Sequence, residues 1–316
     1  MSVILGEGNF KYEALDEWEK LTDGVRLIET PGVAVNSKDE VFAFTRNADN
    51  PIVVFDRDGN ILRTFGQGIF GQRTHGIFIG PDDSVWCVDD GIHTITKFTP
   101  EGKLLMTIGA TGQPSKAWSG EPFNRPTHAA VSPNTGNIYI TDGYGNSRVH
   151  KYSPDGTFIL SWGEPGIDAG QFIRPHNVAV DADDLVYVAD RECHRMQVFD
   201  ADGKFITMWN NIHRPDGMTL GPDGNIYIGE LNGMGGVDDA PGLGHRVSIL
   251  SKKGELLARF GDPEEGEEPG KFIAPHGIAV DSHGDIYVGE VAFTIRGRHL
   301  DPPKEYRSLK KLRKVS

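Results

Sequence analysis

Residues Arg174–Asp181 read RPHNVAVD, and after a polar turn residues Leu185–Asp190 read LVYVAD. Two further runs, Met196–Asp200 and Phe205–Trp209, follow in the same unit. All four runs are short, alternate in polarity and are rich in β-branched and aromatic residues, which is typical of β-strands. The pair Asp202-Gly203 before the last run predicts a tight hairpin, because glycine accepts a positive φ. The unit is therefore predicted to be a sheet of four antiparallel strands.

The first run of this unit recurs along the chain with a period of roughly 40 to 50 residues, which is typical of propeller blades. Its six copies lie in the segments Pro31–Val35, Thr74–Phe78, Pro126–Ala130, Pro175–Val180, Pro215–Met218 and Pro275–Ile278. One sheet of four strands leaves both faces uncovered, whereas six sheets packed around an axis cover one another. The sequence therefore predicts an all-β fold, a six-bladed β-propeller, formed by residues 1–316 as a single domain.

The sixth unit is incomplete in the sequence. After Asp285–Glu290 no Asp-Gly hairpin follows, and the chain continues to a basic tail. We expect Ser308–Val315 to supply the third strand of this blade and an N-terminal segment, Phe10–Tyr12, to supply the outer one. In this interpretation residues 1–24 are an N-terminal closing segment and residues 304–316 a C-terminal closing strand. Such closure leaves no free edge between the first and last blades.

The composition argues against several classes of partner. Asp and Glu number 45 against 32 Lys and Arg, a net charge of −13, and phosphate binding usually needs clustered basic residues. We therefore expect no nucleic-acid partner. No stretch approaches the ~20 apolar residues of a membrane span, so we also expect no membrane partner. The first residues show no basic and apolar pattern of a secretory leader. The two cysteines, Cys87 and Cys193, stand far apart in the sequence, which suits a reducing compartment. We therefore expect a soluble cytoplasmic protein.

Histidine breaks the repeat at one position, the residue just after the opening Pro or Thr. Blade by blade this position is occupied by Gly32, His75, Thr127, His176, Asp216 and His276. The histidines are separated by 101 and 100 residues, two blades each time, so a six-fold arrangement points three imidazoles at one axial point. Three neutral imidazoles with an open position are what a catalytic zinc site requires, although iron, manganese or cobalt could occupy it. The alternative is a repeat residue that hydrogen-bonds the neighbouring strand.

A second set of equivalent positions ends the second strand of each blade: Arg46, Asp89, Asp142, Asp190, Glu230 and Glu290. The five carboxylates are interpreted as structural, accepting backbone N–H bonds within their own blade. Arg46 reverses the charge at this position. Two interpretations stay open for it, an ion pair with a carboxylate of a neighbouring blade or a guanidinium that holds a substrate carboxylate by two hydrogen bonds.

Tyr144 stands between two glycines in the segment Thr141–Arg148, TDGYGNSR, which leaves its ring free to project from the loop. A phenol near a dication and an arginine ionises more easily than in water, so Tyr144 is a candidate general base. The alternative is a tyrosine that only packs. Arg191 on the fourth blade is placed near the same rim as a candidate substrate-binding residue. It could equally form an ion pair with Glu192 or a neighbouring loop.

Over about Gly32–Glu290 these residues resemble the NHL-repeat propeller family and, within it, the peptidyl-α-hydroxyglycine α-amidating lyases (peptidylamidoglycolate lyases). The segments that carry the resemblance are Thr74–Gly76, Thr141–Arg148, Ala189–Glu192 and Ala274–His276. The resemblance implies that a catalytic zinc is held by the same three histidines, His75, His176 and His276. It also implies that Tyr144 is the catalytic tyrosine and that Arg46 and Arg191 bind the substrate.

The chain departs from that family at three positions. Gly145 stands where the family has a disulfide-bonded cysteine, and Ala274 stands in the place of a methionine. Gly277 replaces the aspartate that helps to hold a structural calcium in the family, so the resemblance does not support Ca²⁺ as a cofactor.

The function implied by the resemblance is a metal-dependent lyase. It would cleave the C–N bond of an N-substituted α-hydroxyglycine, a carbinolamide, to an amide and glyoxylate. The expected partner is a small-molecule or peptide-like substrate that bears a carboxylate. Two alternatives stay open: a metal-dependent hydrolase of an ester, lactone or amide, and a non-catalytic binding platform of the NHL type.

Overall fold

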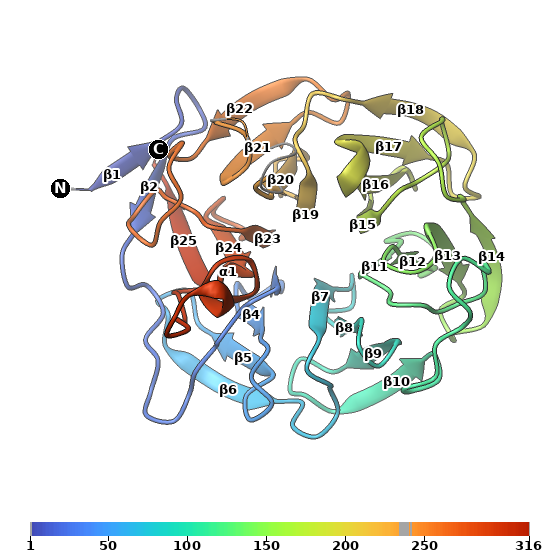
Figure 1. Ribbon diagram of the computed structural model, residues 1–316, viewed down its shortest axis with the longest axis horizontal. Coiled ribbons are helices and arrows are strands. Elements are labelled where there is room, and N and C mark those ends of the chain that lie inside the picture. Colours follow the sequence, from blue (N-terminus) through green and yellow to red (C-terminus); the bar gives the residue numbers. More distant parts are fainter. Residues whose placement is uncertain (1, 234–239, 241, 316) are drawn as a thin grey trace. The chain divides into compact units, whose positions relative to one another are not determined.

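The computed structural model describes residues 2–233, 240 and 242–315. In these residues the strands form six antiparallel sheets, five with four strands and one with five (Figure 1). The chain is a six-bladed β-propeller, which confirms the predicted fold class. It divides into two compact units, a central unit of residues 68–215 and a terminal unit of residues 1–67 and 216–316, and each is described by itself.

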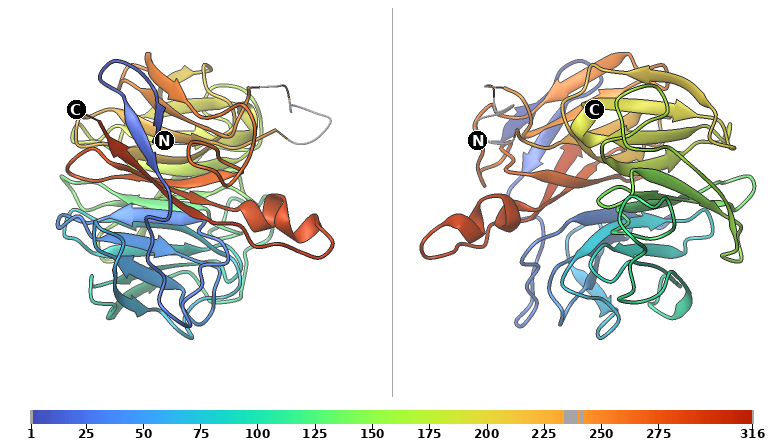
Figure 2. Two further views of the ribbon diagram at one scale, coloured as in Figure 1. Left: turned by 90° about the vertical axis from the view of Figure 1, so that its left-hand side faces the viewer. Right: turned by 45° about the vertical axis from the view of Figure 1, so that its right-hand side comes forward.

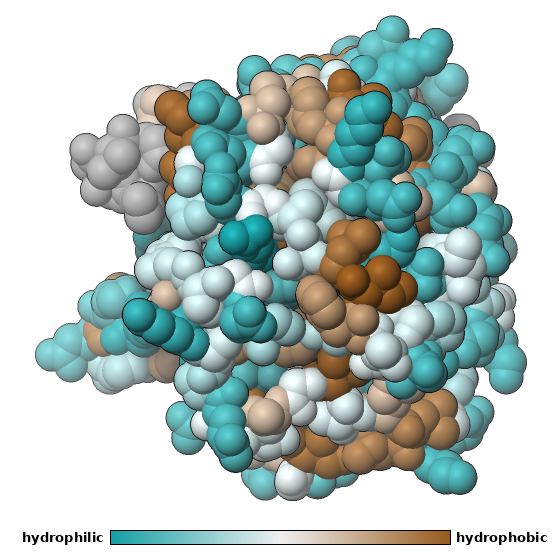
Figure 3. Space-filling view, turned by 90° about the vertical axis from the view of Figure 1, so that its right-hand side faces the viewer, coloured by the Kyte–Doolittle hydropathy of each residue, from teal (hydrophilic) through white to brown (hydrophobic). Residues whose placement is uncertain are grey.

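The central unit contains the second, third and fourth blades. Their strands are β7 (Thr74–Ile79), β8 (Val85–Asp89), β9 (Thr94–Phe98), β10 (Leu104–Ile108), β11 (His128–Val131), β12 (Ile138–Asp142), β13 (Arg148–Tyr152), β14 (Phe158–Trp162), β15 (Pro175–Val180), β16 (Val186–Asp190), β17 (Arg195–Phe199) and β18 (Phe205–Trp209). The first strands of the three blades, β7, β11 and β15, are neighbours. The second strands are buried throughout, whereas β10, β14 and β18 expose apolar side chains, some of which appear on the face in Figure 3.

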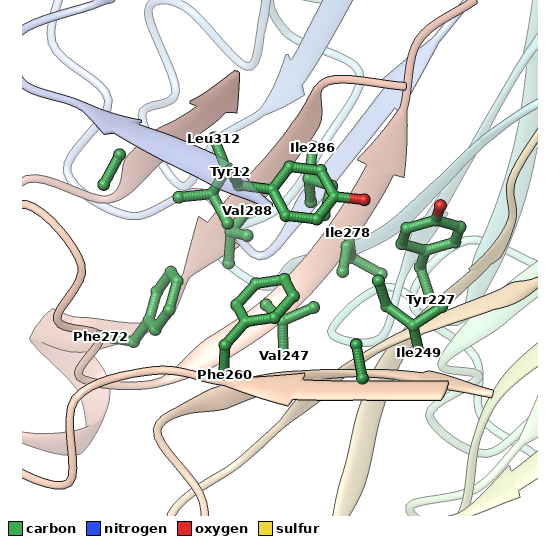
Figure 4. Packing of buried hydrophobic residues seen from close by; sticks show 12 residues of the cluster. Tyr12, Tyr227, Val247, Ile249, Phe260, Phe272, Ile278, Ile286, Val288 and Leu312 are labelled. Carbon is green, nitrogen blue, oxygen red and sulfur yellow. The ribbon is translucent and has the colours of Figure 1, made fainter. Parts of the chain in front are cut away.

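The terminal unit contains the first, fifth and sixth blades. Their strands are β3 (Gly32–Val35), β4 (Val41–Phe44), β5 (Ile52–Phe55), β6 (Ile61–Phe65), β19 (Pro215–Leu220), β20 (Ile226–Glu230), β21 (Arg246–Leu250), β22 (Leu256–Phe260), β23 (Pro275–Val280), β24 (Ile286–Glu290), β25 (Leu309–Lys314), β2 (Tyr12–Leu15) and β1 (Val3–Leu5). Figure 4 shows the apolar packing of this unit, where the Tyr12 and Phe260 rings lie 5.2 Å apart. This cluster joins the N-terminal strand to the fifth and sixth blades, and so it ties distant parts of the sequence together.

The sixth sheet contains both ends of the described chain. Strand β25 pairs with β24, so the prediction that Ser308–Val315 supplies the third strand is confirmed. The outer strand is β2, not Phe10–Tyr12 as predicted: Phe10 lies in a turn, where its N–H bonds Glu7 O, and pairing starts with Tyr12 opposite Lys314. Strand β1 adds a fifth strand that the sequence analysis did not predict. The segment Leu231–Gly244, which its length and glycine content predict to be a surface loop, lies partly outside the described residues.

A short helix, α1 (Ala292–Ile295), and a 3₁₀ turn at Gly297–His299 follow β24, where the first four blades have a short connection between the second and third strands. Figure 2 shows this segment projecting beyond the strands of the terminal unit. Another 3₁₀ turn, Arg191–Cys193, follows β16 in the central unit. None of the described helices has the length and the apolar composition that a membrane crossing requires.

Candidate active site

His75 and His176 are the two predicted metal ligands that lie in the central unit, near the starts of β7 and β15. Both side chains are buried, and their ring centroids are 4.8 Å apart. The register of β7 against β8 shifts after Thr74, and that of β15 against β16 shifts at His176. Such bulges re-aim a side chain, which explains why a residue of the innermost strand can turn toward its counterpart two blades away. The structure therefore brings these two residues together.

The third predicted ligand, His276, lies in the terminal unit in an equivalent local setting. Its strand β23 also shifts register against β24 at this residue, between Pro275 and Gly277, and its side chain is buried. Nδ1 of His276 lies 2.7 Å from the carbonyl oxygen of Pro31, the residue that precedes β3. A carboxylate oxygen of Asp216, the fifth-blade residue of the same set, lies 4.0 Å from its Nε2.

The hydrogen bonds of these histidines fix which ring nitrogen carries the proton. Nδ1 of His75 lies 2.6 Å from the carbonyl oxygen of Thr127 in the next blade, as Nδ1 of His276 does from that of Pro31. A carbonyl oxygen only accepts, so Nδ1 donates and Nε2 of a neutral ring presents a lone pair. Metal-binding histidines are commonly held in this way by their second nitrogen. The hydrogen bond to a neighbouring strand, which was the alternative interpretation, is thus present at Nδ1 of His75 and of His276.

Tyr144 places its hydroxyl between the two histidines of the central unit. The hydroxyl lies 3.0 Å from Nε2 of His75 and 3.1 Å from Nε2 of His176. The flanking glycines act through close packing, because a Cβ at Gly143 would lie 2.0 Å from the Pro175 carbonyl oxygen and one at Gly145 would lie 2.1 Å from an Asn124 side-chain oxygen. The predicted free projection of the loop is therefore corrected: the glycines let the loop lie against its neighbours, and this fixes the ring.

Guanidinium groups surround the Tyr144 ring. The central guanidinium carbons of Arg125, Arg174 and Arg191 lie 4.6, 5.2 and 5.6 Å from its centroid. Sequence reasoning singled out only Arg191. A signal for the others was present, because arginine stands directly before the opening Pro or Thr in four consecutive blades, at Arg73, Arg125, Arg174 and Arg214.

Two carboxylates pair with these arginines. Asp90 accepts two bonds from Arg73, at 2.5 and 2.8 Å, and a longer one of 3.3 Å from Arg125. Glu192 accepts bonds from Arg191, Arg214 and Arg174. Five guanidinium groups thus face two carboxylates, a surplus of three positive charges among these groups. The arrangement suits an anionic ligand.

The charges of this cluster shift the pKa values of its members. Burial alone would raise the pKa of Glu192, but the charges and hydrogen bonds of Arg191, Arg214 and Arg174 outweigh burial and lower the pKa to about 2. Burial, together with the nearby charge of Arg191, lowers the pKa of the Arg174 guanidinium. Glu192 is therefore ionised at neutral pH and organises three cations around itself.

Arg191 takes part in both arrangements that the sequence left open for it. Its Nε donates to Glu192 at 2.9 Å, and its guanidinium lies over the Tyr144 ring. Its side chain is only 7% exposed, so the ion pair forms in a largely desolvated place.

Arg46 lies in the terminal unit in an ion pair, but its partner is Glu29, which precedes the first strand of the same blade, and not a carboxylate of a neighbouring blade as predicted. Its Nη1 donates to Glu29 at 2.7 Å and to the Thr294 hydroxyl of α1 at 2.8 Å. The Glu29 carboxylate is buried and also accepts the backbone N–H of Thr294. The sequence could not identify Glu29 as the partner, because nothing in the repeat marks this residue.

The five carboxylates that end the second strands are largely structural, as predicted. Asp89, Asp142, Asp190 and Glu290 accept backbone N–H bonds from the segment that precedes their own blade's first strand. Glu230 differs, because its carboxylate is held by the side chains of Arg246, Ser248 and Arg259.

Gly277 packs closely against the first blade within the terminal unit. A Cβ there would lie 2.8 Å from the Val33 nitrogen and 2.9 Å from the Gly32 Cα. An aspartate at this position would require the backbone to move. The absence of a calcium cofactor stays a prediction.

Known proteins similar to this chain share its repeat. The chain matches the NHL repeat family over residues 123–152 and 172–199. NHL repeat-containing protein 3 of Homo sapiens is 35% identical, and the match covers 82% of this chain and 76% of that protein. Peptidyl-alpha-hydroxyglycine alpha-amidating lyase 1 of Drosophila melanogaster is 32% identical over 74% of this chain and 45% of its own length.

Other relatives are longer. Peptidyl-glycine alpha-amidating monooxygenase B of Xenopus laevis is 30% identical over 87% of this chain, which spans 32% of that protein. Among solved structures, a streptogramin B lyase superposes with a TM-score of 0.62 over 94% of this chain and 99% of its own, at 15% sequence identity. At that identity the structural similarity supports the propeller fold alone.

Proposed function

This chain belongs to the NHL-repeat family of β-propellers, and we propose that it is a metal-dependent carbon–nitrogen lyase. Its substrate is an N-substituted α-hydroxyglycine, which it splits into an amide and glyoxylate. One observation carries the proposal: Nε2 of His75 and of His176 meet at the Tyr144 hydroxyl. The 32% identity to the Drosophila lyase supports the choice of this reaction.

The proposed metal site consists of His75 and His176 from the central unit and His276 from the terminal unit. We propose that these three side chains together hold one ion. Their chemistry fits, because His75 and His276 are held at Nδ1 by carbonyl oxygens and present Nε2 as a lone pair. Three neutral imidazoles suit zinc, and iron, manganese or cobalt accept the same donors. A bound dication supplies a Lewis acid that stabilises negative charge on a substrate oxygen.

Tyr144 is proposed as the general base of the reaction. Its oxygen takes the proton of the substrate α-hydroxyl group as the C=O bond of glyoxylate forms. The C–N bond breaks with its electron pair moving to nitrogen, and Tyr144 passes the proton that it has accepted to this nitrogen, which gives the neutral amide and regenerates the phenolate base. No water is consumed, which distinguishes this lyase from a hydrolase.

The substrate carboxylate is proposed to bind to arginine. Arg191 is the predicted substrate-binding residue that lies beside Tyr144, and Arg46 is the predicted residue of the terminal unit. The surplus positive charge around Tyr144 supports an anionic substrate. We also propose a cytoplasmic location, which two free cysteines, Cys87 and Cys193, support.

Incubation with N-acetyl-α-hydroxyglycine tests the proposal. We expect glyoxylate and acetamide in equal amounts, and loss of this activity after treatment with a chelator and recovery with zinc. Metal analysis of protein purified without added metal is the companion measurement. Hydrolysis of an ester or lactone without any release of glyoxylate would overturn the lyase assignment. A metal-free protein without activity would favour a binding platform.

A further inference from the structure

Arginine stands directly before the opening residue of four consecutive blades, from the second to the fifth. These four arginines differ in the hydrogen bonds that they donate to carboxylates. Arg73 gives two short bonds to Asp90, and Arg214 gives two bonds, of 3.1 and 3.0 Å, to Glu192. Arg125 gives Asp90 a single longer bond of 3.3 Å. Arg73 and Arg214 thus each donate two hydrogen bonds to a carboxylate of the protein.

Arg174 resembles Arg125 in this respect. It gives Glu192 a single bond of 3.2 Å, and its Nε is buried with no hydrogen-bond partner among the described residues. A buried donor without a partner costs free energy, so its retention calls for an acceptor from outside the chain. A guanidinium offers five N–H donors, and among the described residues that of Arg125 donates one hydrogen bond to Asp90 and that of Arg174 donates one to Glu192.

Exposure separates these two arginines from the two that the sequence singled out. The side chains of Arg125 and Arg174 are 38% and 35% exposed, whereas those of Arg191 and Arg46 are 7% and 13% exposed. Arg125 and Arg174 also lie nearer to the Tyr144 ring centroid than Arg191 does. They combine access for a ligand with proximity to the proposed base.

We propose that Arg125 and Arg174, two guanidinium groups from adjacent blades, form an anion site beside Tyr144 and bind the carboxylate of the substrate in addition to the arginines named above. The identification of the anion as the substrate's carboxylate rests on the proposed function, whereas the anion site itself does not. Asp90 accepts a bond from Arg125 and Glu192 accepts one from Arg174, so each carboxylate helps to position one of the two guanidinium groups. The ligand is a small α-hydroxy or α-keto carboxylate.

Calorimetric titration of the metal-loaded protein with glyoxylate, and with its uncharged amide, tests this site. We expect Arg125→Gln and Arg174→Gln each to weaken glyoxylate binding about ten- to hundredfold, as loss of a charge-assisted hydrogen bond does. Binding of the amide should change little. Arg63→Gln removes one positive charge from β6, where Arg63 pairs with Glu40, and serves as the matched control with unchanged binding.

The lysine variants keep the proposal testable if a glutamine variant misfolds. Arg125→Lys and Arg174→Lys keep the charge and should bind glyoxylate with an intermediate affinity, because lysine lacks the planar donor pair. Wild-type affinity in both glutamine variants, or no measurable glyoxylate binding to the unaltered protein, would overturn the proposal. If the unaltered protein releases glyoxylate from N-acetyl-α-hydroxyglycine but both glutamine variants bind glyoxylate as tightly as it does, the anion-site proposal is overturned and the lyase proposal stands. Glyoxylate binding that depends on these arginines, in a protein without any lyase activity, would support the anion site and overturn the proposed function.

Discussion

Replacement of Tyr144 by phenylalanine is expected to remove most of the turnover and to leave the protein folded and loaded with metal. The variant loses one oxygen, which lies 3.0 and 3.1 Å from two histidine nitrogens. General-base catalysis contributes about 10²–10⁴-fold, so kcat should fall by that factor, which corresponds to about 3–5 kcal/mol in the activation free energy. KM should change little, because the hydroxyl acts on the reacting proton. Steady-state release of glyoxylate measures both constants.

Stability and a matched variant separate this role from a structural one. The two hydrogen bonds of the Tyr144 hydroxyl are worth about 0.5–1.5 kcal/mol each, so the free energy of unfolding should fall by no more than about 3 kcal/mol. Tyr139→Phe removes a hydroxyl from β12 of the same blade, where it donates to the Ala201 carbonyl oxygen, and should leave kcat unchanged. A Tyr144→Phe variant with full metal content and a kcat within threefold of the unaltered protein would refute the general-base role.

Three further predictions test other parts of the structure. His276→Ala should strip the metal, as measured by elemental analysis, and leave the thermal unfolding of the apo protein nearly unchanged; global unfolding on metal loss would make the site structural. Arg46→Ala should lower the free energy of unfolding by about 3–5 kcal/mol in denaturant titrations, because it leaves the buried Glu29 carboxylate without its cation. Adding Glu29→Gln to this variant should restore part of the lost stability. An unchanged stability of Arg46→Ala would favour the substrate-binding role. Burial raises the pKa of Glu19 from 4.5 to about 6, so the folded state favours the protonated acid, and this contribution is present below pH 4.5 and lost as the pH rises through 6. Glu19→Gln should therefore be more stable than the unaltered protein by about 2 kcal/mol at pH 8 and equal to it at pH 4, as denaturant titrations at the two pH values would show.

The blade repeat was predictable because each element of it follows from local chemistry. Period-two alternation sets the strands, and Asp-Gly pairs such as Asp202-Gly203 set the hairpins. The closing strand near Ser308–Val315 was also predictable, because the sixth unit lacked one. Closure of the six blades as one domain stays a prediction.

The outer strand of the sixth blade was misplaced because its register depends on a distant partner. Tyr12 pairs with Lys314, and no local pattern distinguishes this pairing from one that starts at Phe10. The partner of Arg46 was missed for the same reason, since Glu29 belongs to no repeat position. The four arginines of the central unit were missed although their signal was in the sequence. They follow the repeat, whereas the predicted site residues were those that depart from it.

Departure from the repeat is not a sufficient criterion for a functional residue. The hydrogen-bond partners of the side chain have to be considered as well. His75 and Arg46 both depart from their repeat positions, yet Arg46 bonds Glu29 and Thr294, whereas Nε2 of His75 faces the Tyr144 hydroxyl of the candidate site. Arg174 follows a repeat and still has a buried Nε with no partner among the described residues. Buried donors and lone pairs cost free energy when they stay unused, so the residues to test first are those whose polar atoms the fold itself leaves without a partner. By this criterion Arg174 ranks above Arg46 as a carboxylate-binding residue, although the sequence alone favoured Arg46.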